Sequence, residues 1–285
     1  MPILGAHMSI AGGYYKAVEA AAKLNMDCLQ IFTKNNNQWR AKPILDEEAQ
    51  RFKQRLEDLE VSHPLSHTSY LINLASPDRE LRKKSIDAMV VELQRAEQLG
   101  IPAVVLHPGS YTASSEEQGL KAIVQSLDEV FGQTRELRCQ CLLENTAGQG
   151  TNLGWRFEQL ATLLDGVNDS SRLGVCFDTC HALAAGYSIE NKKGYRSTMR
   201  EFDRLVGVER IEAIHLNDSK RELGSRVDRH EHIGQGHIGL DGFRSLLNDR
   251  RFHKTPMYLE TPKGDCDGEP WDEVNLRTLR ELVEH

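Results

Sequence analysis

The sequence predicts an α/β protein built as a single (β/α)8 TIM barrel. Eight short apolar runs, of the kind that form buried parallel strands, alternate with longer amphipathic runs. The residues that end the apolar runs recur at intervals of 26 to 45 positions, which suits one strand plus one helix. Eight such units favour a closed barrel, although an open doubly wound sheet would show the same period. Because barrels of about 250 residues commonly form one unit, we expect residues 1–285 to be a single domain.

The expected strands are rich in Val, Ile, Leu and Cys, and several of them end in His, Asp or Glu. They cover residues 2–7, 28–33, 64–68, 103–109, 139–146, 173–181, 211–218 and 256–261. Expected helices between them include the acid-rich stretch 46–60, residues 80–100 with a glycine stop signal, and residues 116–131. The longest irregular piece, 219–239, is predicted to be a functional loop, because long loops in compact domains usually carry function.

Composition predicts a water-soluble protein that works in the cytoplasm, without a membrane partner. No apolar run approaches the roughly 18 residues of a membrane span, and the N-terminus reads as a first strand rather than a signal peptide. The six cysteines lack C-x-x-C spacing, and most lie in or beside apolar runs, so we expect reduced, buried thiols.

The net charge of −7 by itself argues against a nucleic-acid ligand. Two features weaken that objection: bound divalent ions would offset the charge, and several expected loops are locally basic. The basic loop residues are Lys34, Arg40, Lys42, Lys220, Arg221, Arg226 and Arg229.

Metal-binding residue types follow one expected strand after another, from the third to the eighth. In a barrel these positions converge on the C-terminal face of the strands, where active sites lie. Imidazole and carboxylate groups are the ligands that zinc prefers. The candidates are His67, His107, Glu144, Asp178, His181, His215, Asp228, His230 and Glu260.

Nine ligands exceed the four that one tetrahedral zinc takes, so the set suits two or three ions with a bridging carboxylate. Clustered ions serve phosphoryl transfer well. Any one of these residues alone could be a hydrogen-bonded structural group, but a structural explanation would be needed separately at every position. His7, at the end of the first strand, is expected to orient a ligand or solvent. A thiolate ligand at Cys180, beside His181, is an alternative.

Several segments closely resemble the endonuclease IV family of zinc-dependent apurinic/apyrimidinic (AP) endonucleases. They are FTKNNNQWR (32–40), SYLINL (69–74), LHPGS (106–110), ENTAGQGTNLG (144–154), GVCFDTCHALAAGY (174–187), HLNDSK (215–220) and GSRVDRHEHIGQG (224–236). The resemblance runs essentially from end to end of the chain. It implies a TIM barrel that cuts the phosphodiester bond 5′ to abasic sites in duplex DNA, leaving a 3′-hydroxyl and a 5′-deoxyribose phosphate. It also implies a phosphodiesterase or phosphatase activity that trims blocked 3′ ends.

The same resemblance implies three Zn²⁺ per chain, with Mn²⁺ able to substitute at some positions, and catalytic roles for Glu144 and Glu260. The first metal would take His67, His107 and Glu144. The second would take Glu144, Asp178, His215 and Glu260. The third would take His181, Asp228 and His230.

The family bends its DNA and flips out the abasic nucleotide, and Tyr70 and Leu71 match residues that fill the gap. Asn37 matches a third DNA-contacting position, where the family often has Arg. Two further departures are Thr68, for the usual Asp, and Gln235, for a Glu. Local core packing is the alternative role for Tyr70 and Leu71.

We therefore expect a monomeric DNA-repair nuclease, associated with the nucleoid if the source is bacterial. Two other functions compete with this one. A metal-dependent sugar isomerase or epimerase would use a related barrel with fewer metals. A non-catalytic binder of damaged DNA would not need an intact set of nine ligands.

Overall fold

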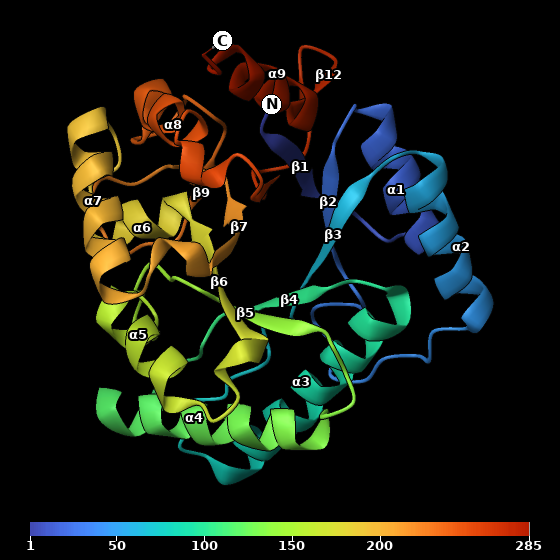
Figure 1. Ribbon diagram of the computed structural model, residues 1–285, viewed down its shortest axis with the longest axis vertical. Helices are drawn as coiled ribbons and strands as arrows, with labels where there is room; N and C mark the ends of the chain where they lie inside the picture. The colour runs from blue at the N-terminus through green and yellow to red at the C-terminus, as the bar shows by residue number, and fades with distance from the viewer. Residues whose placement is uncertain (285) are drawn as a thin grey trace.

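The computed structural model describes residues 1–284 and shows a closed barrel of eight parallel strands inside a ring of helices (Figure 1). The strand order around the barrel is β1-β10-β7-β6-β5-β4-β3-β2. Closure comes from β1, which pairs in parallel with β2 on one side and with β10 on the other. The alternative of an open sheet is therefore wrong. The barrel strands are β1 (Ile3–His7), β2 (Cys28–Phe32), β3 (Ser62–His67), β4 (Ala103–Leu106), β5 (Gln140–Glu144), β6 (Leu173–Asp178), β7 (Ile211–His215) and β10 (Pro256–Leu259).

Several helices begin where a side chain supplies a capping group. For α3, the Asp78 carboxylate accepts hydrogen bonds from the backbone N–H groups of Glu80 and Leu81, and Gly100 ends the helix with a positive φ of 71°. The helices are α1 (Tyr14–Lys23), α2 (Asp46–Asp58), α3 (Arg79–Leu99), α4 (Glu116–Gln133), α5 (Phe157–Gly166), α6 (Thr179–Ala185), α7 (Lys192–Leu205), α8 (Gly239–Leu247) and α9 (Trp271–Glu281). The three helices predicted from the sequence agree with α2, α3 and α4 to within two residues at each end.

One layer of side chains inside the barrel consists of small and apolar residues from seven of the strands. Tyr258 is the largest of them, and its hydroxyl donates a hydrogen bond to the His63 carbonyl at 2.7 Å. This interior cluster consists of Cys28, Leu65, Ala103, Val105, Leu142, Cys176, Ala213 and Tyr258. A much larger apolar layer lies between the strands and the helices.

A polar level lies directly above the interior cluster because side chains two residues apart on a strand point the same way. Two positions after Leu65 comes His67, and two positions after Leu142 comes Glu144. The same step leads from Cys176 to Asp178, from Ala213 to His215 and from Tyr258 to Glu260. The strand pleat thus points these residues into the C-terminal mouth of the barrel.

Several strands are shorter than predicted: those expected at 103–109, 139–146, 173–181 and 211–218 end at Leu106, Glu144, Asp178 and His215. Residues 179–181 were predicted to extend the sixth strand, but they form the first turn of α6, because the Asp178 carboxylate accepts a hydrogen bond from the His181 N–H at 2.7 Å and caps the helix. The predicted irregular loop 219–239 contains a short antiparallel pairing of β8 (Asp218–Ser219) with β9 (His230–Glu231). The buried Asp218 carboxylate stabilises this loop by accepting backbone N–H groups from Gly234 and Ile238.

Two further observations concern the chain as a whole. All six cysteines are free thiols; five are buried, and Cys266 is half-buried. Among residues 1–284, no helix combines the length and the apolar character needed to cross a bilayer.

Candidate metal centre

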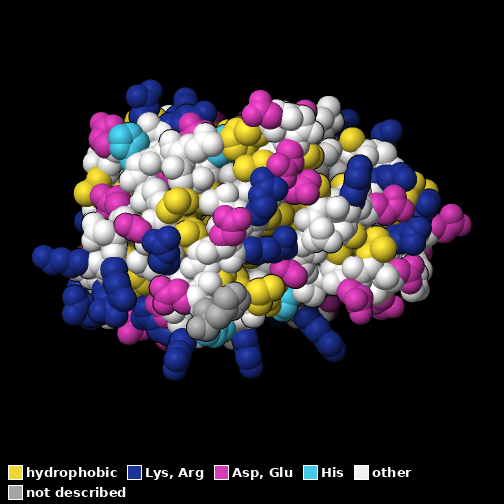
Figure 2. Space-filling view, turned by 90° about the horizontal axis from the view of Figure 1, so that it is seen from above, with side chains coloured by type: hydrophobic (Ala, Val, Ile, Leu, Met, Phe, Trp, Pro, Cys, Tyr) yellow, Lys and Arg dark blue, Asp and Glu magenta, His cyan; other side chains and the backbone are white. Residues whose placement is uncertain are grey.

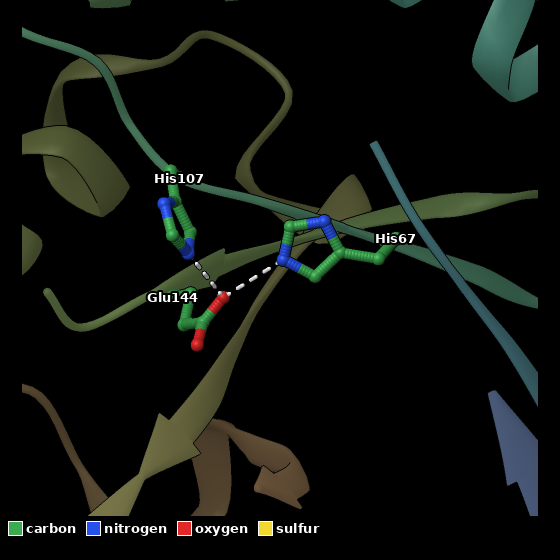
Figure 3. A group of neighbouring side chains, drawn as sticks. All are labelled: His67, His107 and Glu144. Atoms are coloured by element: carbon green, nitrogen blue, oxygen red, sulfur yellow. Dashed lines mark hydrogen bonds and ion pairs between the residues drawn. The ribbon is translucent and has the colours of Figure 1, made fainter. Parts of the chain in front are cut away.

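The first group of predicted ligands comes from three neighbouring strands. His67 ends β3, His107 follows β4, and Glu144 ends β5. The Nε2 atoms of His67 and His107 lie 3.1 Å and 2.9 Å from the same carboxylate oxygen, Oε2 of Glu144 (Figure 3). Three donor atoms that converge at this spacing could hold one metal ion.

The second group shares Glu144 with the first. Its other oxygen, Oε1, lies 3.0 Å from Nδ1 of His215, and that nitrogen is also 3.2 Å from Oε2 of Glu260. Donor atoms of Glu144, Asp178, His215 and Glu260 all lie within 4.8 Å of one another. Because its two oxygens face different groups, Glu144 has the geometry of a carboxylate that bridges two ions.

The third predicted group consists of His181 on α6, Asp228 in the loop before β9, and His230, the first residue of β9. The two carboxylate oxygens of Asp228 lie 3.2 Å from Nε2 of His181 and 3.3 Å from Nε2 of His230. Both Nε2 atoms are buried, and neither has a hydrogen-bond partner within residues 1–284. Since buried polar atoms are normally satisfied, two unsatisfied imidazole nitrogens around one carboxylate fit a cation site.

Cys180 also lies near this third group, within reach of Asp228 and His230. Burial raises the pKa of its thiol to about 12. A thiol must lose its proton to bind a metal, so the two imidazoles and Asp228 are the better donors.

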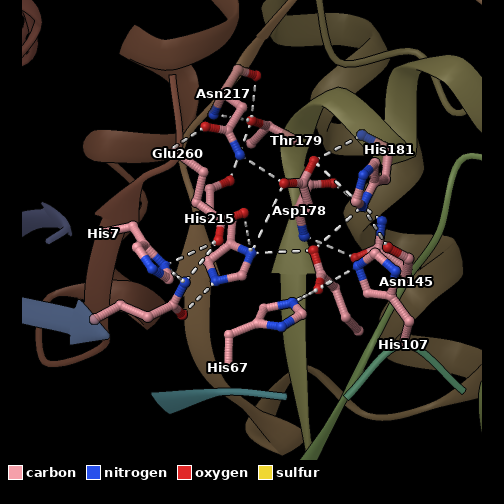
Figure 4. Close-up of polar contacts among 12 residues, drawn as sticks. His7, His67, His107, Asn145, Asp178, Thr179, His181, His215, Asn217 and Glu260 are labelled. Carbon is pink, nitrogen blue, oxygen red and sulfur yellow. Dashed lines mark hydrogen bonds and ion pairs between the residues drawn. The ribbon is translucent and has the colours of Figure 1, made fainter. Parts of the chain in front are cut away.

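Backbone carbonyls orient three of the imidazoles through contacts with their Nδ1 atoms. Nδ1 of His67 donates to the Thr68 carbonyl at 2.8 Å. Nδ1 of His181 donates to the Asn145 carbonyl at 2.9 Å (Figure 4) and also lies 3.2 Å from Oε1 of Glu144. Nδ1 of His230 likewise meets the Glu260 carbonyl at 3.1 Å. Each contact leaves Nε2 free to face the carboxylates, which is the usual arrangement of metal-ligating histidines. The His67 contact uses the backbone of Thr68, so the Thr that replaces the family's Asp preserves it.

Without metal, the histidines and carboxylates shift one another's pKa values in opposite directions. Burial lowers the pKa of His230, but Asp228 and Asp178 more than offset this and raise it to about 9. Burial raises the pKa of Glu144, but His107 and His215 bring it well below its ordinary value. The metal-free cluster therefore binds protons on its imidazoles, in the place that cations would take.

Three amide side chains that the sequence interpretation missed hold the ligands. Asn217 donates to the Asp178 carboxylate at 2.7 Å and accepts from the Glu260 N–H at 2.8 Å. Asn145 accepts from the Asp178 N–H at 2.8 Å. Gln30, in the middle of β2, donates to Oε1 of Glu260 at 2.6 Å. The signal was present: a lone amide in an apolar strand must find a buried polar partner.

His7 lies where it was expected, at the edge of the second group. Its Nδ1 faces the Gln30 amide at 3.0 Å and lies 3.7 Å from Oε1 of Glu260. Burial lowers the pKa of His7, although the hydrogen bond to Glu260 opposes this. A neutral His7 can hold Gln30 and Glu260 in place without adding charge to the cluster.

Of the predicted DNA-contacting residues, Tyr70 lies beside this centre. The Tyr70 side chain is 59% exposed although its ring centroid is only 5.6 Å from that of His67, and a cavity of about 150 Å³ lies between Tyr70, His67 and His107. Leu71 is half-buried, and Asn37 is exposed. The exposure of Tyr70 argues against a core-packing role for it.

The loops that carry Asn37 and Tyr70 are joined by polar contacts. Ser69 donates its hydroxyl to the Asn36 carbonyl at 2.5 Å. The buried Glu92 carboxylate, on α3, lies 3.2 Å from Nζ of Lys34 and accepts the Ser69 N–H at 3.3 Å. Gln235, the other departure from the family pattern, is exposed on the loop before α8.

The chain is similar over its whole length to known proteins. A family model described as a xylose isomerase-like TIM barrel matches residues 18–282. A probable endonuclease 4 from Geobacter sp. (strain M21) is 49% identical, and the alignment covers all of both chains. A probable endonuclease 4 from Chloroflexus aurantiacus is 50% identical over 100% of this chain and 99% of its own. The chain belongs to the endonuclease IV family.

Solved structures lead to the same family. The crystal structure of endonuclease IV from Thermus thermophilus superimposes with a TM-score of 0.85 at 38% identity, covering 99% of this chain and 98% of that one. A D-tagatose 3-epimerase-like protein superimposes with a TM-score of 0.74 at only 20% identity, covering 99% of this chain and 97% of that one. At that identity the likeness shows the shared barrel alone.

Proposed function

We propose that this endonuclease IV family member is a DNA-repair enzyme that hydrolyses the phosphodiester bond 5′ to abasic sites in duplex DNA. Two observations carry the proposal. The first is the two ligand groups that share Glu144, with His181 and His230 both close to Asp228. The second is the exposed tyrosine beside them at the mouth of the barrel. The products would be a 3′-hydroxyl and a 5′-deoxyribose phosphate. Trimming of blocked 3′ ends would use the same centre on a related phosphodiester or phosphate.

Three Zn²⁺ would be held by these groups, with Mn²⁺ able to replace some of them. When bound, such ions lower the pKa of water, neutralise phosphate charge and stabilise the leaving oxygen. The side chains of this protein would set the positions of the ions. Glu144 joins the first and second groups, while Glu260 faces His215 and is positioned by Gln30. Asp228 draws His181 and His230 together in the third group.

Selection of damage would depend on the loops at the mouth of the barrel. An abasic nucleotide has no base to unstack, so flipping it out costs less than flipping an intact one. Tyr70, with Leu71 beside it, would fill the space that the nucleotide leaves. Asn37, on the adjoining loop, would contact the same stretch of DNA but without the cation that an Arg would provide.

A sugar isomerase or epimerase on the same barrel is the rival function. Such an enzyme would have no role for the third ligand group or for the exposed Tyr70. A non-catalytic binder of damaged DNA would have no role for the unsatisfied imidazole nitrogens of His181 and His230.

We further infer that residues 1–285 work as one domain and as a monomer. Free thiols at all six cysteines support a reducing compartment such as the cytoplasm, with the nucleoid as the place of work in a bacterium.

The test uses an end-labelled duplex with one synthetic abasic site. The purified protein should cut it 5′ to the lesion and leave a 3′-hydroxyl that a polymerase can extend, and a chelator should abolish the cut. Glu260→Gln keeps the hydrogen-bonding shape but removes a charge, so it should lower cleavage by several orders of magnitude while binding to the abasic duplex survives. Near-normal cleavage by this variant would remove Glu260 from the centre. Epimerisation of a ketose, with no cut in the DNA, would favour the rival function.

A further inference from the structure

A basic groove runs along the outer wall of the barrel between α7 and α8. It encloses about 760 Å³ and is lined by the first turn of α7, the exposed side of α8 and the 3-10 helix η3 (Arg250–Phe252). A second hollow continues it along α7 toward Arg200. Figure 2 shows Lys and Arg side chains gathered at the lower left of the molecule, on the flank where Figure 1 places α7 and α8.

The groove is positively charged although the chain as a whole carries a net charge of −7. Only three of its lining residues, Asp241, Asp249 and Glu284, are acidic, and Asp241 and Asp249 pair with cations of the groove, Arg244 and Arg251. Seven lining residues are basic: Lys192, Lys193, Arg196, Arg200, Arg244, Arg250 and Arg251. Five of these, all except Arg244 and Arg251, form no ion pair with any residue of 1–284.

Three of the basic side chains are arranged in a row along α7 and do not converge on one point. Lys192, Arg196 and Arg200 lie four residues apart on one face of α7, so they span about 12 Å along the helix. Burial of Met199 and Phe202 fixes α7 against the core. A rigid row of this length meets several negative charges that follow one another, as phosphates do along one strand of a duplex.

The groove lies apart from the metal centre. Arg250 and Arg251 stand between α8 and the start of β10, which places them toward the N-terminal ends of the barrel strands. The predicted metal ligands lie at or beyond the C-terminal ends. A duplex seated over the metal centre therefore leaves this wall of the barrel available.

We propose that the α7–α8 groove is a second DNA-binding surface, which holds the phosphate backbone of an undamaged duplex segment without reading its sequence. The chemistry of the lining favours DNA over an acidic protein. Protein interfaces need aromatic or aliphatic anchors at their centre. Among residues 1–284, the only large hydrophobic side chain that lines the groove is Tyr195, and it is buried. Two separate DNA contacts on one chain would raise the local concentration of DNA around the metal centre.

The experiment compares two charge-reversed proteins that change the net charge equally. The test variant carries Lys192→Glu, Arg196→Glu and Arg200→Glu. The control carries Lys121→Glu, Arg135→Glu and Arg138→Glu, which are exposed and outside the groove. Binding to an intact duplex is measured by anisotropy at several salt concentrations. A neutral variant, with Gln at the three test positions, keeps the test valid if the Glu variant folds poorly by circular dichroism.

The test variant should bind intact duplex about ten-fold or more weakly at low salt, and its salt slope should fall by about 2 to 3, near 0.9 per lost phosphate contact. Its cleavage of a short abasic duplex should stay at the level of the control, because the groove does not touch the metal centre. A salt slope equal to that of the control would overturn the proposal. Loss of binding to polyglutamate, with duplex binding unchanged, would also overturn it and assign the groove to an acidic polypeptide. Failure of the proposed cleavage activity would appear in the unaltered protein and leave the salt slope intact.

Discussion

The side-chain amide of Gln30 accepts a hydrogen bond from Nε2 of His215 at 2.8 Å across the interior of the barrel. Gln30 lies on β2 and His215 on β7, two strands that do not pair with each other. The contact fixes the imidazole so that Nδ1 faces Glu144 and Glu260. The amide nitrogen of Gln30 meanwhile donates to Glu260 at 2.6 Å. One buried side chain thus orients two predicted ligands of the second metal.

Gln30→Ala should weaken metal binding at the second group. Contacts of this kind typically contribute 10–100-fold in metal affinity or activity, so we expect about that loss. Competition with a zinc-binding dye would measure it on the purified protein. Gln140→Ala is the matched control, because Gln140 lies on β5 at the opposite end of the barrel, facing Glu212. Equal zinc affinity in both variants would contradict an orienting role for Gln30.

Removal of the metals should destabilise the protein and reveal their number. Gently purified protein should contain about three ions per chain, because one tetrahedral zinc takes only four of the nine ligands. A chelator should lower the melting temperature and re-added zinc should restore it, since an ion that binds only the folded state stabilises it.

In the metal-free protein the pKa of His230 is raised to about 9, so below that pH an ion must displace a proton. Apparent zinc affinity should therefore fall as the pH is lowered from 9, and one ion or none in active protein would exclude the three-metal centre.

The period-two rule explains how much of this centre could be predicted from the sequence. His67 and Glu144 end strands whose inward positions are apolar, so the hydrophobic pattern already places them on the inner face. The same rule leads from Cys28 to Gln30, and there an amide was overlooked because only charged and imidazole groups were sought. Asp178 shows the limit of the approach. Its side chain caps α6, and that local hydrogen bond ended the strand earlier than the apolar run predicted.

A buried ion pair should couple stability to recognition of the lesion. Lys34 and Glu92 are both buried, and Glu92 also accepts from Thr33 and Ser69, at the bases of the loops that carry Asn37 and Tyr70. Glu92→Gln would leave the Lys34 charge buried and unpaired, so we expect a loss of about 3 kcal/mol in the free energy of unfolding. Preference for abasic over intact duplex should fall as well. Denaturant unfolding and anisotropy measure the two effects.

The double variant Lys34→Met with Glu92→Leu separates these effects. Apolar residues of similar size commonly replace a buried pair without loss of stability, so unfolding should return close to that of the unaltered protein. The abasic preference should stay low, because the apolar replacement of Glu92 cannot accept the Ser69 N–H. Recovery of both properties together would show that the pair acts through stability alone.

Asn37→Arg should tighten binding to abasic duplex. Asn37 is exposed on the loop after β2, so a longer side chain there meets no core packing. Arg would add a cation and a planar group that can stack on a base. The salt slope of binding should steepen by up to about 0.9, the value of one phosphate contact. Asn37→Gln, which lengthens the side chain without charge, is the control and should leave the slope unchanged; a slope that does not move with Arg would place Asn37 away from the DNA.

Tyr70→Ala should weaken binding to abasic duplex and leave the metals in place. The Tyr70 ring lies 5.7 Å from the Phe32 ring and 5.6 Å from the His67 ring, and these contacts hold it in place. Its side chain is 59% exposed, so part of the ring surface is open to a ligand. Stacking of an aromatic side chain on a base contributes about 1–3 kcal/mol, and we expect a loss in that range. Tyr70→Phe keeps the ring and should keep most of the affinity. The measurement is affinity for abasic and for intact duplex, with zinc content and melting temperature determined on the same preparations. If Tyr70→Ala loses affinity for both duplexes equally while its zinc content is normal, Tyr70 contributes to general contact with DNA and not to recognition of the missing base.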